Sequence, residues 1–360
     1  MGKDILKGTI LAYLSMRCPM NQQVFSKLKL QFYPLRSTAI GFPSGSEILP
    51  SALKHAWDSQ ALEQEYDQWR NLNQSFPWAV EIYPDFPWME AIFGCTIRAA
   101  KEGYLVLPSN GTFLTSDCDA PEVLFSQSPW IEAYFTLIEK VFQFARYKFP
   151  VALPAFTGPV HLLASLVGKE ELKKLLTTDP ERVDNKIEQI TFLYVSFYNR
   201  ILDIVKPTPF GYIAGGCFLC SSEPLLVLKD PNWMEFQPLL PIETLFPNQF
   251  LRNLSCRVFL STPSHALRWL EPTENSIFTE GIIVEKDEYS LPWEDLIPLF
   301  RMIQALGKTL VIAGPPEMED WEFALRDLAP ENLIVLFYIT SFQEVKFWSE
   351  HLLEKDRRSY

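Results

Sequence analysis

The chain has 360 residues and a net charge of −12, and 48% of its residues are apolar. This apolar content is enough to bury a large core, and the acidic balance argues against nucleic acid or an anionic membrane as the main partner. Six cysteines in a chain of this length do not indicate a disulfide framework, and no apolar run approaches the ~20 residues of a membrane helix. We therefore expect a globular protein of the reducing cytoplasm.

The first 75 residues are predicted to form an N-terminal extension rich in loops and helices. Lys3 and Lys7 precede a short apolar run, but Arg17 interrupts that run and no small-residue cleavage site follows, so a secretory leader is not expected. A helix followed by a strand is indicated between Asn21 and Leu35. Leu53 to Leu72 reads as a polar surface helix. Residues 76–360 are then predicted to form the main domain.

The main domain begins with alternating strand and helix patterns. A strand is indicated from Trp78 to Tyr83, and a proline-rich turn and a short helix carry the chain to Cys95. Trp130 to Tyr147 shows the apolar period of a helix. A further strand is indicated at Gly211 to Gly215. Arg257 to Leu260 reads as another.

The stretch from Val151 to Leu202 predicts a strand, a tight turn, a short helix and a long helix. The strand ends in Thr157-Gly158-Pro159, where the glycine permits an unusual turn and the proline suits the first position of a helix. Asp179-Pro180-Glu181 opens the long helix with an N-cap, a helical proline and a first-turn acid. Apolar residues then recur at three- and four-residue steps from Val183 to Ile204.

The last eighty or so residues show the most regular pattern. Strands begin at Gly281, Thr309 and Leu333, and a helical pattern follows each of them. Short successive strand–helix units require parallel strands joined by right-handed crossovers. A doubly wound sheet would carry a glycine-rich fingerprint after an early strand, and the chain has none. The pattern therefore predicts an α/β protein, specifically a (β/α)8 TIM barrel with one strand still to be placed.

Three short sequences carry a resemblance to a known superfamily. They are Phe156-Thr157-Gly158-Pro159, Gly168-Lys169-Glu170-Glu171-Leu172 and Asp179-Pro180-Glu181-Arg182-Val183. They resemble the uroporphyrinogen decarboxylase-like superfamily, which includes corrinoid-dependent methyltransferases. The resemblance implies the same barrel. For an enzyme it implies lyase chemistry (a decarboxylation) or corrinoid-linked methyl transfer, acting on a small or tetrapyrrole-like ligand.

The chain departs from the superfamily at its chemical groups. In the cobalamin-linked methyltransferases, the strand corresponding to Arg257 to Leu260 ends in a His-x-Cys pair that binds zinc, whereas here Ser261, Thr262 and His265 follow it. The decarboxylase itself carries an N-terminal pair of arginines, where this chain offers Arg17 alone. We therefore expect neither a zinc-thiolate site nor uroporphyrinogen as the substrate. No cofactor is required on this interpretation, and a corrinoid supplied by a partner protein is the alternative.

Chemistry in such a barrel takes place at the carboxyl ends of the strands, which selects the candidate site residues. The catalytic candidates are His161, Glu285 and Asp287. An imidazole has an ordinary pKa of ~6.5, which suits proton transfer, and two carboxylates two residues apart on an extended chain share a face. The alternative for His161 is a structural histidine that bonds a loop carbonyl. The alternative for Glu285 and Asp287 is an ordinary solvated loop. The candidates for substrate binding are Trp88, Thr157, Tyr212, Ser261, Thr262, His265 and Tyr338.

The Cys217-Phe-Leu-Cys220 sequence is a lone C-x-x-C motif. A structural zinc needs a second pair of ligands and none lies nearby in the sequence, so two buried thiols are the preferred interpretation. Two functions stay open for the whole chain, and a zinc- or thiol-dependent methyltransferase that uses Cys217 and Cys220 ranks behind both. One is an enzyme of the superfamily, acting on a small-molecule or tetrapyrrole-like ligand with or without a corrinoid protein as partner. The other is a degenerate barrel that binds a ligand without catalysis. A homodimer is an open alternative for either.

Overall fold

The structure, a computed structural model, describes residues 29–34, 42–56, 58–69, 79–101, 103–108, 128–146, 148–217, 219–229, 236, 256–269, 280–286, 290–315, 327–339 and 343–344. Its centre is a seven-stranded parallel sheet in the order β1-β11-β10-β9-β8-β7-β4. The strands are β1 (Lys29–Pro34), β4 (Ala155–Thr157), β7 (Leu225–Lys229), β8 (Arg257–Pro263), β9 (Gly281–Glu285), β10 (Thr309–Gly314) and β11 (Leu333–Ile339).

Continuous apolar runs build these strands, because a parallel sheet is covered on both faces. The first four residues of β7 and the first five of β11 are all buried. The predicted α/β class is confirmed, and so are the strands at Gly281, Thr309 and Leu333. The helix after the first of these is α14 (Trp293–Ala305). The helices expected after the other two lie almost wholly outside the described residues.

Two further parallel contacts extend the sheet at β4. Val80 forms a bridge with Val151, and Leu153 forms one with Ala214. The chain just before β4, at residues 151–153, is hydrogen-bonded to other segments on both sides. β4 therefore ends the strand order given above, but it is not the edge of the sheet. Among the described residues β1 does not pair with the segment at Val80, so the structure shows a parallel sheet without showing a closed barrel.

The strand β1 lies within the segment predicted as an N-terminal extension. It pairs along its whole length with β11, from Lys29 opposite Ile334 to Pro34 opposite Ile339. The strand indicated before Leu35 is therefore confirmed, and it belongs to the central sheet.

The strand β7 was not predicted. The strand expected at 211–215 is the short β5 (Tyr212–Ile213), which pairs with β6 (Cys220–Ser221) in a separate hairpin.

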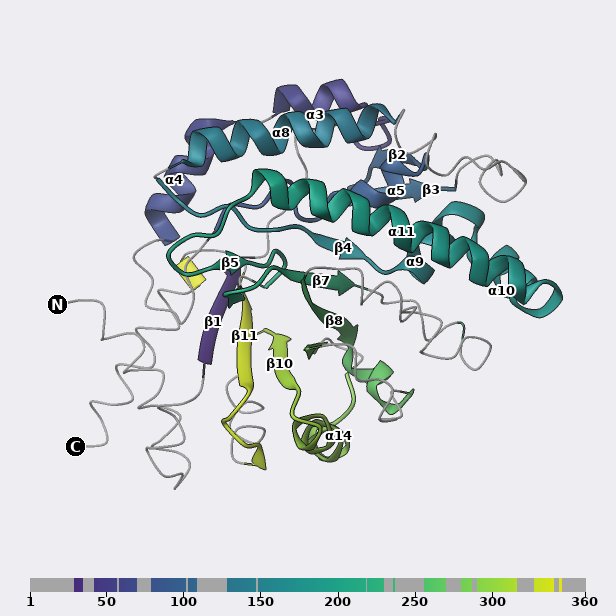
Figure 1. Cartoon of the computed structure of the whole chain (residues 1–360), viewed down its shortest axis with the longest axis vertical. Coiled ribbons are helices and arrows are strands. Elements are labelled where there is room, and N and C mark those ends of the chain that lie inside the picture. The colour runs from purple at the N-terminus through teal and green to yellow at the C-terminus, as the bar shows by residue number, and fades with distance from the viewer. Residues whose placement is uncertain are drawn as a thin grey trace.

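Helices cover the sheet on both sides (Figure 1). The helices α3 (Pro50–Ala56), α8 (Pro129–Ala145) and α11 (Pro180–Ile204) lie above β4 and β7 in this view, and α14 lies at the opposite side of the sheet. The remaining elements are α4 (Ser59–Trp69), α5 (Trp88–Ile92), α9 (Pro159–Val167), α10 (Lys169–Thr178), the 3-10 helix η2 (Ser264–Trp269) and the hairpin of β2 (Thr96–Ala99) with β3 (Tyr104–Leu107). None of the described helices has the length and apolar character needed to cross a membrane.

The predicted strand–turn–helix stretch folds as its sequence indicates. The Asp179 carboxylate accepts a hydrogen bond from the Arg182 N–H at 3.3 Å and caps α11, and Pro180 occupies the first turn. The apolar stripe of α11 is buried. Its Tyr194 hydroxyl donates to the Thr157 carbonyl at 2.7 Å, which fixes the end of β4.

Candidate functional site

A cleft with a volume of about 310 Å³ opens at the carboxyl ends of β4 and β7. Residues 84–90, which lead into α5, form one wall, and the end of β4 and the start of α9 form another. Lys229 at the end of β7 and Val106 of β3 complete the lining. In Figure 1, α9 lies beside the arrowhead of β4, and α5 contacts both β4 and α9. The cleft therefore lies at the end of the sheet where a parallel barrel carries its ligand site.

The central acid of the cleft is Glu90, in the first turn of α5. Its side chain is buried, with 2% of the residue exposed. The Thr157 hydroxyl donates to Oε1 at 3.0 Å, and Nε2 of His161 lies 3.8 Å from the same oxygen. The second oxygen, Oε2, is buried and has no hydrogen-bond partner among the described residues. The structure thus brings Thr157 and His161, both predicted site residues, together around a carboxyl group that the sequence analysis did not select.

Burial raises the pKa of the Glu90 carboxyl above its ordinary value. Hydrogen bonds from its own backbone and from Thr157 oppose this shift, but desolvation is the larger effect. A neutral carboxyl also lowers the cost of burying the unpartnered Oε2. Glu90 is therefore suited to hold a proton at a pH where an exposed glutamate would have lost it, and to exchange that proton with a bound molecule.

The same shift predicts that Glu90 makes the protein less stable as the pH rises. The unfolded carboxyl ionises near the ordinary value of 4.5, whereas the buried carboxyl keeps its proton. From that pH up to the raised native pKa the unfolded state binds fewer protons than the native state, so the free energy of unfolding falls as the pH rises and then levels off. Urea unfolding of Glu90→Gln across this range should show a flatter dependence. The exposed Glu139→Gln change on α8 is the control, and an unaltered slope in Glu90→Gln would contradict the prediction.

Aromatic side chains give the cleft an apolar wall. The Trp88 ring stands edge-on to Phe86, with ring centroids 4.7 Å apart. The indole N–H of Trp88 donates to the Ile82 carbonyl at 3.2 Å. Because this donor is already satisfied within the protein, Trp88 offers a ligand mainly apolar surface. Phe156 of β4 also lines the cleft.

A glycine turn at residues 215–217 lies next to the cleft. The Gly216 N–H donates to Oε1 of the buried Glu81 at 2.8 Å. A side chain at Gly216, whose φ is +74°, would place its Cβ 3.3 Å from Nζ of Lys229, so the glycine leaves room for the ammonium group. Burial raises the pKa of the Cys217 thiol to about 12, and it does the same for Cys220. Both thiols are therefore neutral near pH 7 and poor metal ligands.

A second polar cluster joins three predicted residues at the ends of β8, β9 and β11. The Ser261 hydroxyl donates to Oε1 of Glu285 at 2.6 Å. The Tyr338 hydroxyl also donates to the Glu285 carboxylate. Burial, the negative charge of Glu285 and the nearby Cys217 hold the pKa of Tyr338 well above its ordinary value. Glu285 is thus held by two protein hydroxyl groups.

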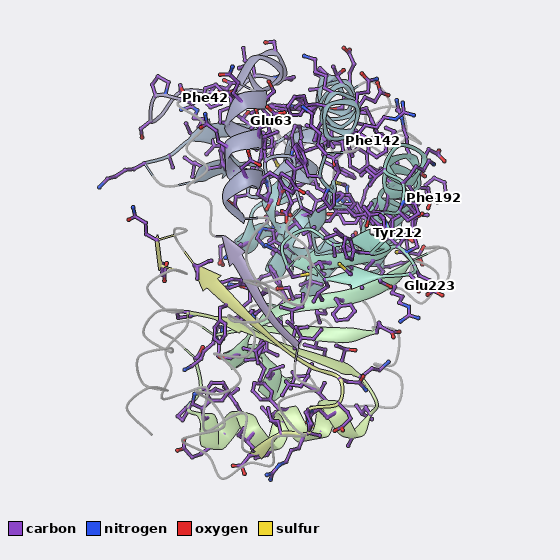
Figure 2. All side chains as sticks on the ribbon, turned by 90° about the vertical axis from the view of Figure 1, so that its left-hand side faces the viewer. Phe42, Glu63, Phe142, Phe192, Tyr212 and Glu223 are labelled. Atoms are coloured by element: carbon purple, nitrogen blue, oxygen red, sulfur yellow. The ribbon has the colours of Figure 1, made fainter. Side chains whose placement is uncertain are left out.

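The other predicted residues lie apart from these two clusters. Thr262 is buried on β8, on the face opposite to Ser261, because successive strand residues alternate. His265 lies in η2, and its Nδ1 has no hydrogen-bond partner in the described part of the chain. Tyr212 pairs with Ser221 in the β5–β6 hairpin, and Figure 2 shows it on the same side as Glu223. Asp287 lies outside the described residues.

The position of Tyr212 follows from its neighbours. Tyr212 and Cys256 both lie close enough to the Tyr198 hydroxyl to raise its pKa, although burial is the larger cause. Since Cys256 directly precedes β8, this is the amino-terminal end of the sheet, away from the cleft. The structure therefore does not bring Tyr212 together with His161, Thr157 and Trp88.

Three charged groups near the cleft were missed by the sequence analysis. Glu90 interrupts the otherwise apolar helix Trp88–Ile92, and Lys229 ends the apolar strand Leu225–Lys229. Glu81 stands next to the bridge residue Val80. A single charge inside or at the end of an apolar run is the sequence signal that marks Glu90 and Lys229, because burying a charge is energetically costly.

Comparisons with known proteins find a similar solved structure. No family model matches the sequence, and no curated protein matches it. Among solved structures, a methyltransferase from Methanosarcina mazei superposes with a TM-score of 0.54 and 14% sequence identity, over 99% of this chain and 98% of that chain. At this identity the likeness shows a shared fold. The chain is therefore an α/β protein with a parallel sheet and a polar cleft at the strand ends, and it shares its fold with that protein.

Proposed function

We propose that the chain is a methyltransferase-type (β/α)8 barrel of the uroporphyrinogen decarboxylase-like superfamily. The eight strand positions would be β1, the segment at Val80, β4 and β7 to β11, in this order around the barrel. Parallel contacts are observed between every neighbouring pair in this order except between β1 and the segment at Val80. On this proposal β1 belongs to the barrel, and the N-terminal extension contributes a strand to the main domain.

The observation that carries the catalytic part of the proposal is the buried Glu90 carboxyl beside His161. Methylation of an N–H, O–H or S–H group releases a proton, which a base must take up. The imidazole of His161 can accept that proton, and the Glu90 carboxyl 3.8 Å away can, once ionised, stabilise the resulting imidazolium. Thr157 keeps Glu90 in place through the 3.0 Å hydrogen bond.

The cleft favours methyl transfer on a small molecule over decarboxylation of a tetrapyrrole. A ligand with many carboxylates needs a cluster of cations, and Lys229 is the single lysine or arginine among the described lining residues. A volume of about 310 Å³ is at the lower end for small-molecule sites. Zinc does not fit this site, because the described residues contain no group of three or more His, Cys, Asp and Glu side chains that could hold a metal ion.

The test is a methyl-transfer assay with the purified full chain. Methylcobalamin is the methyl donor, and small thiols, amines and phenols that carry a carboxylate are the acceptors. Loss of the methylcobalamin absorption spectrum together with a methylated acceptor, seen by mass spectrometry, is the expected result. Failure of every acceptor class, with protein that is folded by circular dichroism, would reject methyl transfer.

The second candidate function is a degenerate barrel that binds its ligand without catalysis. The observation in its favour is Glu285, whose carboxylate is already held by Ser261 and Tyr338. A carboxylate with two internal partners is less free to act on a ligand. This candidate predicts tight ligand binding, detected by calorimetry, without any methylated product.

A further inference from the structure

The cleft combines an apolar wall with one cationic side chain, Lys229. This lysine ends β7, is half-buried and lines the cleft. No ion pair or hydrogen bond of its side chain is found with the described residues, and its charge lowers the pKa of the nearby Cys217 thiol against the larger effect of burial. A half-buried ammonium that no described side chain pairs with directly can bind a negative group of a ligand in the cleft.

No described ion pair joins Lys229 to the neighbouring carboxyl groups. Oε1 of Glu81 accepts the Gly216 N–H, and Oε1 of Glu90 accepts the Thr157 hydroxyl. Asp85 also lines the cleft, but it is exposed to solvent, which screens its charge. Because burial raises the pKa of Glu90, this carboxyl opposes the entry of an anion less than an exposed glutamate would.

The start of α9 adds a second attraction for an anion. This nine-residue helix begins directly after Thr157 and Gly158, and its first turn contributes His161 to the cleft. No side chain caps its N-terminus, because the N-cap residue is Gly158. Uncapped N–H groups and the positive end of the helix dipole both favour a negative group nearby.

We propose that the ligand of this cleft is a small monoanion, with its acidic group bound by Lys229 near the start of α9 and its apolar or aromatic body against Trp88 and Phe156. The inference rests on the proposed function only in assigning the ligand to this cleft. A carboxylate is the simplest such group, and the cleft volume of about 310 Å³ leaves room for a body the size of one aromatic ring.

Calorimetric titration of the full chain tests this proposal with matched acids and amides. The probes are phenylacetate and isovalerate, and the neutral controls are phenylacetamide and isovaleramide. We expect each acid to bind at least about 10-fold more tightly than its amide, since a charge-assisted hydrogen bond contributes on this scale. Lys229→Met should weaken acid binding by about 10- to 100-fold and leave amide binding unchanged, and Lys229→Arg should retain most of the acid affinity.

The exposed Lys140→Met change on α8 is the matched control, because it removes the same charge far from the cleft lining. If Lys229→Met does not fold, the preference of the wild-type protein for acid over amide decides the question. Equal binding of acids and amides, or no binding of either acid, would overturn the proposal. Acid binding that depends on Lys229 in a protein without methyl transfer would reject the proposed function and retain the ligand class. Methyl transfer to neutral acceptors at the same rate in Lys229→Met as in the wild type would reject the anionic ligand class and retain the proposed function.

Discussion

The Glu90→Gln protein should transfer methyl groups with a kcat lower by a factor of about 10²–10⁴, the usual contribution of a positioned acid–base group. Glutamine keeps the size of the side chain and can still accept the Thr157 hydroxyl, so the fold of α5 and the shape of the cleft are preserved. It cannot exchange a proton with His161 or with a bound molecule. Steady-state kinetics with methylcobalamin and the acceptor that the wild-type protein methylates would measure the loss.

The pH profile separates this role from a structural one. In the wild-type protein, kcat/KM should change as Glu90 titrates, at a pH above the ordinary range of a glutamate because burial raises its pKa. Glu90→Gln should lose that limb of the profile. The Glu139→Gln change on the exposed face of α8 should leave both the rate and the profile as they are. A Glu90→Gln protein with wild-type kcat would remove Glu90 from the mechanism.

The C-terminal half of the sheet was predictable because its signals are local. β9, β10 and β11 are rich in Ile and Val, they are buried almost throughout, and they recur at a regular spacing with helical patterns between. β7 was missed for a local reason as well. Its sequence Leu-Leu-Val-Leu-Lys is short and leucine-rich, a composition that a buried helix shares.

The place of β1 could not be predicted, because its partner is β11 at the other end of the chain. Parallel pairing between distant segments leaves no periodic mark in either one. The candidate site divides in the same way. Thr157 and His161 were selected because they follow a recognisable strand and turn. Glu90 was missed because an acid in the first turn of a helix is common, and its burial arises only when α5 packs against β4 and α9.

The Phe197→Ala protein should be less stable than the wild type by about 3–5 kcal/mol, the usual cost of removing a buried phenyl ring. Phe197 of α11 is 1% exposed. Its ring centroid lies 5.0 Å from that of Tyr134 on α8 and 5.6 Å from that of Phe156 on β4. The ring therefore joins two helices to the strand that carries Thr157, and its loss leaves a cavity among large side chains that cannot close around it.

Phe192 of the same helix provides the matched control for this change. It is 57% exposed, and Figure 2 shows its side chain at the surface of the molecule. Phe192→Ala should alter the free energy of unfolding by no more than about 0.5 kcal/mol, as exposed substitutions usually do. Urea denaturation followed by circular dichroism compares the two variants with the wild type. Since both substitutions remove the same atoms from the same helix, a difference of several kcal/mol between them measures the burial of Phe197 against α8 and β4, and equal effects would contradict this packing of α11.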